Sequence, residues 1–164
     1  MPKATRRARK LLAEALRLEP GHLEALQLQA TIDLGAGDAA SAARILGQAA
    51  GQHPKDYHVR YKLSQAYQRL GKESLAREEA QASQALRELL ERFAKLHEQA
   101  IADPANVELR YQLGVVANQL DKRELARSWF TAVLALDPDH AGARQALEAM
   151  ARPPSSSERT AKPR

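Results

Sequence analysis

Five histidines give this chain its main capacity for catalytic or metal chemistry, because it contains no cysteine. They are His22, His53, His58, His97 and His140. A helical metal site typically needs two histidines one turn apart with a glutamate beside them, and no pair here has that arrangement. The sequence therefore predicts no bound metal ion and no cofactor.

The motifs of two further kinds of chemistry are missing. A serine nucleophile often stands in a Gly-x-Ser-x-Gly turn, and phosphate groups are often held by a glycine-rich loop before a helix. Neither pattern occurs in the 164 residues. We therefore expect a protein that is not an enzyme and has no small-molecule substrate.

Four prolines recur at regular intervals along the chain: Pro20, Pro54, Pro104 and Pro138. The first and last intervals are both 34 residues, and the middle one is 50, which is 34 plus 16. A fixed period of this size is typical of a solenoid, in which each repeat buries its apolar face against the next. Solenoids usually bind partners rather than perform chemistry.

Each repeat is predicted to be a pair of helices. A proline disfavours the α conformation in the residue before it, so each proline indicates a helix end. Gly37, Gly71 and Asp121 fall in mid-repeat, where a tight turn would separate two helices. An alanine follows each turn at the same distance, and its small side chain lets two helices approach closely. These alanines are Ala42, Ala76 and Ala126.

These patterns resemble the tetratricopeptide repeat family, most clearly over residues 107–140. The matching places hold Leu113, Gly114, Ala126, Phe130 and Pro138. Arg110 and Ala117 depart from the family pattern, and in the preceding repeat Ala80 stands where an aromatic residue is usual. The resemblance covers about residues 5–150. It implies an all-α fold, a right-handed solenoid of antiparallel helix pairs.

The resemblance divides a domain of residues 1–151 into a half repeat at 5–19, repeats at about 23–56, 57–103 and 107–138, and a capping helix at 139–150. Residues 152–164 lack apolar content and are predicted to be a disordered basic tail. Residues 26–34 alternate between apolar and polar types, which by itself indicates a strand. Alanine and glutamine are poor strand formers, so we favour a helix there.

Residues 73–102 contain no proline or glycine and predict one helix of about 30 residues, roughly 45 Å long. Its apolar seam has the spacing of a short coiled coil, with Leu86, Leu89 and Phe93 at its centre. The helix either serves the repeats on both sides or pairs with a second copy, which would give a homodimer. If neighbouring helices leave them uncovered, these three residues are self-association candidates. The side chains expected to face water are Glu79, Gln81, Ser83, Gln84, Glu88 and Arg92.

In the family, the inner face of each first helix lines a groove for partners. The resemblance places seven candidate partner contacts there: His58, Tyr61, Gln65, Gln68, Glu108, Tyr111 and Asn118. Exposed tyrosine offers contact area at little entropic cost. Tyr61 and Tyr111 hold equivalent places, and each either contacts a partner or packs against the adjacent helix.

A carboxylate clamp for chaperone peptides, known in the family, uses lysine, asparagine and arginine. The corresponding places here hold Gln27, Thr31, Glu108 and Gln112. The resemblance therefore does not support a co-chaperone role.

The formal charge of +5 is concentrated at the two ends of the chain. Residues 1–10 carry +5 and residues 152–164 carry +3, which leaves −3 for the middle. Basic arms can contact phosphates, but solvated termini explain them equally well, so nucleic acid is not the expected partner. No apolar run approaches the ~20 residues that span a bilayer. We expect no membrane partner and a cytoplasmic protein.

The sequence thus predicts a non-catalytic scaffold module that binds a protein or peptide through its inner helices. Two alternatives stay open. The first is a structural segment of a larger repeat protein, and the second is an adaptor that contacts RNA through its basic arms. Salt dependence separates the last, because phosphate contacts weaken steeply with salt.

Overall fold

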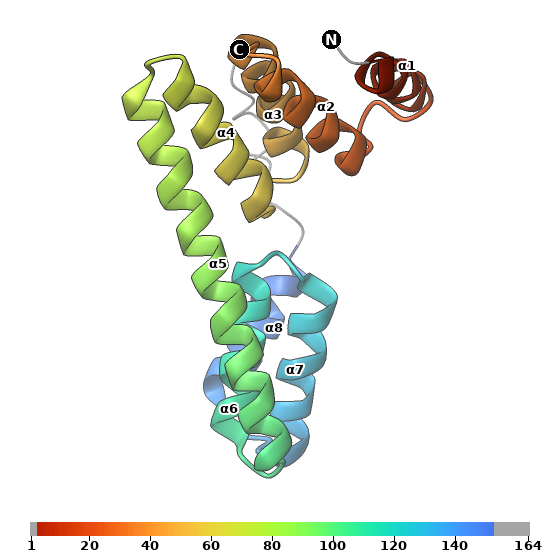
Figure 1. Cartoon of the computed structure of the whole chain (residues 1–164). Coiled ribbons are helices and arrows are strands. Elements are labelled where there is room, and N and C mark those ends of the chain that lie inside the picture. The colour runs from red at the N-terminus through yellow and green to blue at the C-terminus, as the bar shows by residue number, and fades with distance from the viewer. Residues whose placement is uncertain (1–2, 153–164) are drawn as a thin grey trace. The chain divides into compact units, whose positions relative to one another are not determined.

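The computed structural model describes residues 3–152, which form eight helices and no strand (Figure 1). The helices are α1 (Lys3–Leu18), α2 (Leu23–Gly35), α3 (Ala39–Gln52), α4 (Tyr57–Arg69), α5 (Glu73–Ala102), α6 (Val107–Gln119), α7 (Arg123–Leu136) and α8 (Ala141–Ala151). The all-α prediction and the long helix at 73–102 are confirmed, and residues 26–34 lie in a helix. Apart from Arg152, the predicted disordered tail lies outside the described residues.

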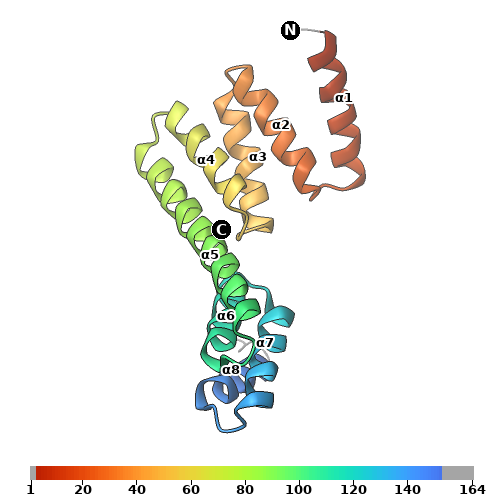
Figure 2. The same cartoon turned by 60° about the horizontal axis from the view of Figure 1, so that its bottom comes forward.

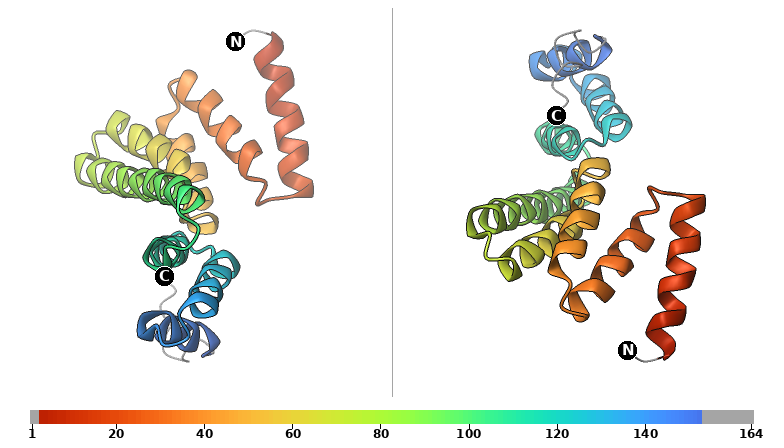
Figure 3. Two further views of the ribbon diagram at one scale, coloured as in Figure 1. Left: turned by 90° about the horizontal axis from the view of Figure 1, so that it is seen from below. Right: turned by 90° about the horizontal axis from the view of Figure 1, so that it is seen from above.

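The chain divides into two compact units, Met1–Glu88 and Leu89–Arg164. The first unit contains α1 to α4 and the beginning of α5. In it, α2, α3 and α4 lie side by side with alternating direction (Figure 2). The second unit contains the rest of α5 with α6, α7 and α8, and α7 packs against both α6 and α8 (Figure 3).

The turn inside each repeat takes a left-handed backbone conformation. Gly37 has φ +83°, Gly71 has φ +69° and Asp121 has φ +60°. Glycine adopts this conformation without strain, and aspartate tolerates it better than most residues. The following amide donates to the carbonyl five residues back, as Asp38 does to Asp33 at 2.9 Å, so the helix ends in a Schellman motif.

The turn between repeats is held by an arginine that the family pattern does not contain. The Nε of Arg110 donates to the carbonyl of Pro104 at 3.0 Å, and Arg144 makes the same bond to Pro138 at 3.0 Å. Arg60 does so to Pro54 at 2.9 Å. The departure at Arg110 therefore has a structural cause, since its side chain fastens the start of the helix to the preceding turn.

Polar N-caps define where the first helix of each repeat begins. The side chains of His22, Asp56, Asn106 and His140 each accept a bond from the backbone amide three residues on. Such caps satisfy amides that the helix itself leaves unpaired. Two of the five histidines, His22 and His140, thus serve as N-caps.

The core of the first unit lies between α2, α3 and α4. Ala30, Ala42, Leu46 and Ala49 are all 0% exposed, and Val59 of α4 joins the same cluster. Small residues at the contact between α2 and α3 let the two backbones approach closely. The α2–α3 pair is therefore covered by α4, the first helix of the next repeat.

The core of the second unit is built around Phe130. Its ring lies against the backbone of α6, where a Cβ added to Gly114 would be 2.5 Å from Phe130 Cε1. Ala126 and Ala143 share this cluster and are 0% exposed, and Phe93 of α5 packs against it. Because α8 supplies Ala143, this helix pair is also covered by the next first helix.

Ala126→Leu is expected to destabilise the second unit by about 1–3 kcal/mol, because added methylenes in a filled contact force strain. Ala126 has no exposed surface, whereas Ala151 is exposed at the last residue of α8. Ala151→Leu is the matched control and should change the free energy of unfolding by less than about 0.5 kcal/mol. Urea melts of both variants measure the difference, and equal effects would contradict this account of Ala126.

Candidate partner-binding groove

Two tyrosines at equivalent places have different surroundings. Tyr61 of α4 and Tyr111 of α6 are 50 residues apart, the interval between their repeats. The Tyr61 side chain is 54% exposed, whereas Tyr111 is half-buried in the core of its unit. Of the two, Tyr61 presents the larger surface to a partner.

The difference arises from α8. A Cβ added to Gly142 would lie 2.7 Å from the hydroxyl of Tyr111, so the phenol ring is in contact with the backbone of α8. The rings of Tyr111 and His140 are 4.7 Å apart, and those of Tyr111 and Phe130 are 5.8 Å apart. Tyr111 is therefore a packing residue between consecutive repeats.

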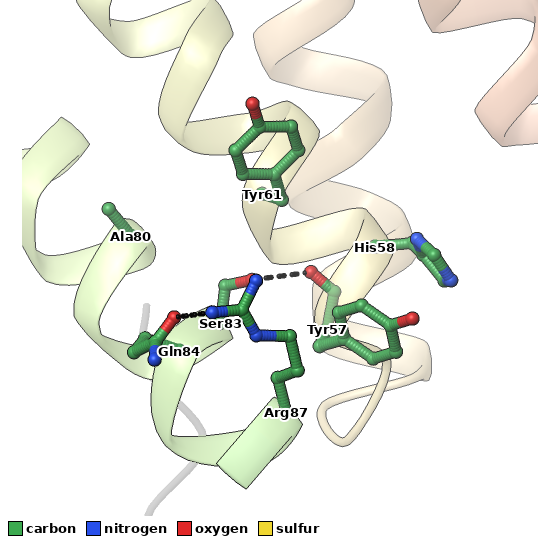
Figure 4. A pocket seen from close by; sticks show the side chains of 7 residues that line it. All are labelled: Tyr57, His58, Tyr61, Ala80, Ser83, Gln84 and Arg87. Carbon is green, nitrogen blue, oxygen red and sulfur yellow. Dashed lines mark hydrogen bonds between the residues drawn. The ribbon is translucent and has the colours of Figure 1, made fainter. Parts of the chain in front are cut away.

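A pocket of about 420 Å³ opens between α4 and α5 in the first unit (Figure 4). Its lining residues are Tyr57, His58, Tyr61, Ala80, Ser83, Gln84 and Arg87. Tyr61 and Ala80 stand on the two helices that form its sides. Two of the seven predicted contacts, His58 and Tyr61, are thus brought together here.

Two side-chain contacts join α4 and α5 beside the pocket. Ser83 Oγ donates to the carbonyl of Tyr57 at 2.8 Å. The Arg60 guanidinium pairs with Glu79 at 2.8 Å, with both side chains 22% exposed. These contacts link the two helices that form the sides of the pocket within the first unit.

A second pocket, of about 340 Å³, continues along the same two helices. It is lined by Ser64, Gln68, Gly71, Glu73, Ala76, Arg77 and Ala80. Ala80 lines both pockets, so they form one groove that follows α4 and α5. We refer to it as the α4–α5 groove.

The groove exists because Ala80 is small. The equivalent places hold Leu46 in the preceding repeat and Phe130 in the following one, which are 0% and 2% exposed. Ala80 is exposed. Where leucine and phenylalanine fill the space between paired helices, alanine leaves it empty. The sequence showed Ala80 as a departure from the family, but the resulting gap was not anticipated.

The remaining predicted contacts are spread over both units. In the first, Gln68 is exposed in the groove and Gln65 is half-buried. In the second, Asn118 is exposed and Glu108 accepts a bond from Gln112 at 2.9 Å. The seven residues do not form one site within either unit.

On α2, the clamp-equivalent residues contact a lysine of the next repeat. Lys62 Nζ donates to Thr31 Oγ1 at 3.2 Å and to Gln27 Oε1 at 3.5 Å. Sequence comparison of the first helices did not single out Lys62, because it stands beside Tyr61 rather than at a groove position.

The three self-association candidates are largely covered. Leu86 is 6% exposed, while Leu89 and Phe93 are half-buried. Phe93 packs against the core cluster of the second unit, to which α6, α7 and α8 contribute. Ser83 was expected to face water but is 6% exposed, because its hydroxyl turns toward α4. Pairing through the long helix stays a prediction.

Within residues 3–152, no group of three or more histidine, cysteine, aspartate or glutamate side chains has a metal-binding arrangement. His97 lies between aromatic rings, with its centroid 6.2 Å from Phe93 and 6.1 Å from Trp129. In the same part of the chain, no helix is both long and apolar enough to cross a membrane.

Paired helices, left-handed turns at a fixed period and close contacts at small residues define a helical-repeat protein. Sequence profiles described as "Tetratricopeptide repeat" match residues 33–97 and residues 107–140. The chain belongs to the tetratricopeptide repeat family. No curated protein matches it in a sequence comparison.

Solved structures similar to this chain are distant in sequence. A crystal structure of MamA is 16% identical, with a TM-score of 0.45, and the match covers 85% of this chain and 72% of that one. MamA residues 41–end from Desulfovibrio magneticus RS-1 are 21% identical, with a TM-score of 0.47 and coverage of 84% and 69%. The first repeat domain of Spaghetti (RPAP3), bound to an HSP90 peptide, is 18% identical, with a TM-score of 0.38 and coverage of 78% and 89%.

Proposed function

We propose that this chain is a non-catalytic protein-interaction module that binds a protein or peptide partner in the α4–α5 groove. The family to which it belongs is generally one of protein-interaction modules. The observation that carries the proposal is the exposed Tyr61 beside the gap at Ala80, on helices that interhelical bonds hold in place. Preformed apolar pockets with a few polar groups are the usual form of a binding site.

Charged side chains of both signs stand at the edge of the groove. Arg77 and Arg87 line the groove from α5, and Glu73 stands at its far end. Glu79 is already paired with Arg60. Arg87 likewise donates to Gln84 at 2.7 Å, so the charged groups at the edge of the groove do not by themselves select the charge of a partner.

Tyr61→Ala is expected to lower partner binding without unfolding the chain. The side chain is half exposed, so its loss should change the free energy of unfolding by under about 1 kcal/mol. Tyr111→Ala should instead destabilise the second unit by about 1–3 kcal/mol, because that ring is packed between α6 and α8. Thermal melts of both variants check this contrast.

Affinity capture from an extract of the source cells then tests the site. The bait proteins are the wild type, Tyr61→Ala and Leu28→Ala. Leu28 is the matched control, since it is 51% exposed on α2 and lies in a different pocket. A protein lost with Tyr61→Ala and kept with Leu28→Ala supports the proposal. Equal recovery by all three would place the binding surface elsewhere.

A second candidate function is a structural contact through α1. Leu11 and Leu18 are 59% and 71% exposed, and an apolar pocket of about 420 Å³ lies between α1 and α2. Such a face is suited to another repeat helix, as in a structural segment of a larger assembly. Loss of a captured protein with Leu28→Ala but not with Tyr61→Ala would favour this function.

The RNA-adaptor alternative depends on the basic residues at both ends of the chain. Those from Lys3 to Lys10 lie within α1, where Arg9 is already paired with Asp33 at 2.7 Å. Phosphate binding would require a steep loss of affinity with salt. Binding that rests on packing against Tyr61 should change little between about 50 and about 300 mM salt, because salt screens charge interactions and not apolar contact.

A further inference from the structure

Two helix pairs are followed by a further helix in the same unit, and in both cases that next helix packs over the pair. We call it the covering helix. The α2–α3 pair is covered by α4, which contributes Val59 to the cluster around Leu46. The α6–α7 pair is covered by α8, which contributes Ala143 to the cluster around Phe130. Among the described residues of Met1–Glu88, no helix covers the α4–α5 pair in this way.

In the α4–α5 pair, the residues that remain accessible stand at the places that are buried in the two covered pairs. Ala42 and Ala126 are 0% exposed, whereas Ala76 at the equivalent place is half-buried. Leu46 and Phe130 are buried, whereas Ala80 is exposed. The α4–α5 groove is therefore a surface of the kind on which a repeat helix docks, and the described residues of the first unit supply no helix for it.

In each of the two covered pairs, the residue of the second helix is larger than the residue that the covering helix contributes to the same cluster. Leucine at 46 shares its cluster with valine at 59, and phenylalanine at 130 shares its cluster with the smaller alanine at 143. Interiors pack to a constant density, so volumes on the two sides of a contact must be complementary. Opposite Ala80, the covering residue should be larger than valine.

We propose that the partner of the α4–α5 groove is an amphipathic α-helix that occupies the place held by α4 and α8 in the other repeats. It inserts a leucine-sized or larger apolar side chain into the gap at Ala80. The partner helix carries a small residue beside Tyr61, because in the second unit the equivalent Tyr111 lies against Gly142 of α8. This inference rests on the proposed function and adds the chemistry of the partner.

Two synthetic peptides with a fluorescent label test the inference on the full chain. One has the native sequence of residues 137–151, which contains α8, and the other carries Ala143→Leu. The wild-type chain should bind the Ala143→Leu peptide about tenfold or more tightly than the native one, measured by fluorescence anisotropy, because the added leucine fills the gap at Ala80. In the Ala80→Leu chain the preference should reverse, because Leu46 is covered by a smaller residue in the same way.

The matched control for the chain is Ala85→Leu, an exposed position on α5 that does not line the groove. It should leave both affinities unchanged. Ala80→Leu should melt at or above the wild-type temperature. If it does not fold, Ala80→Met replaces it, because methionine adapts to irregular gaps. If the wild-type chain and the chain with Ala80 replaced both bind the same one of the two peptides more tightly, the proposal is overturned.

A third peptide separates this inference from the proposed function. It carries Ala143→Leu with Gln145→Pro, which breaks a helix in its interior. The proposal expects it to lose binding. Equally tight binding would show that the groove takes an extended chain, which overturns the helical partner and keeps the function. If no peptide binds up to about 1 mM, the helical partner is likewise overturned, while capture that depends on Tyr61 still decides the function.

Discussion

Replacing Phe130 with alanine is expected to destabilise the second unit by about 3–5 kcal/mol, because it removes a buried ring and leaves a cavity. Phe130 is 2% exposed and stands at the centre of the cluster that joins α6, α7 and α8. The measurement is a urea melt followed by circular dichroism. The control is Leu125→Ala, because Leu125 is 37% exposed on the same helix, and it should cost less than about 1 kcal/mol.

The contact between Phe130 and Gly114 provides a second test of the same packing. Gly114→Ala favours the helix by about 1 kcal/mol through its backbone, but the new Cβ would clash with the ring. We expect a net loss of about 1–2 kcal/mol. With Phe130→Leu added, the pair copies Ala30 and Leu46 of the first repeat, and the double variant should be more stable than the sum of the single effects. Strict additivity would contradict direct contact.

The helices of this chain were predictable because local signals agree with one another. Prolines end the helices, polar caps begin them, and turn residues such as Gly71 adopt the left-handed conformation they favour. The absence of proline and glycine between residues 73 and 102 was sufficient to predict α5. The structure of a repeat sequence can be predicted when helix propensity, turn residues and periodicity all indicate the same elements.

The groove was less predictable because it depends on which helix packs against each tyrosine, and residue type alone does not show this. Tyr61 and Tyr111 have the same residue type at the same place, and only the docking of α8 buries one of them. A comparison of residue size at places 46, 80 and 130 would have indicated the gap. The prediction that Ser83 faces water is wrong for a related reason, because its hydroxyl donates to the carbonyl of Tyr57 in α4.

One buried ion pair was not anticipated. Asp33 of α2 is 1% exposed, and its carboxylate accepts from Arg9 of α1 at 2.7 Å and from Gln29 at 3.1 Å. A buried charge is tolerated only when it is paired and hydrogen-bonded. Two of the four leucines of α1, Leu11 and Leu18, are exposed, so the ion pair joins Leu12 and Leu16 in fixing α1 to its unit.

Arg9→Met is therefore expected to destabilise the docking of α1 by up to about 3 kcal/mol, because Asp33 is left buried without its cation. The loss is limited by the release of α1, which would return the carboxylate to water. Hydrogen exchange should show lower protection in α1 with little change in α7. The double variant Arg9→Met/Asp33→Leu replaces the pair with apolar contact and should recover protection, since buried ion pairs are often no better than hydrophobic ones. If the single and double variants lose protection equally, the ion pair is not what holds α1 in place.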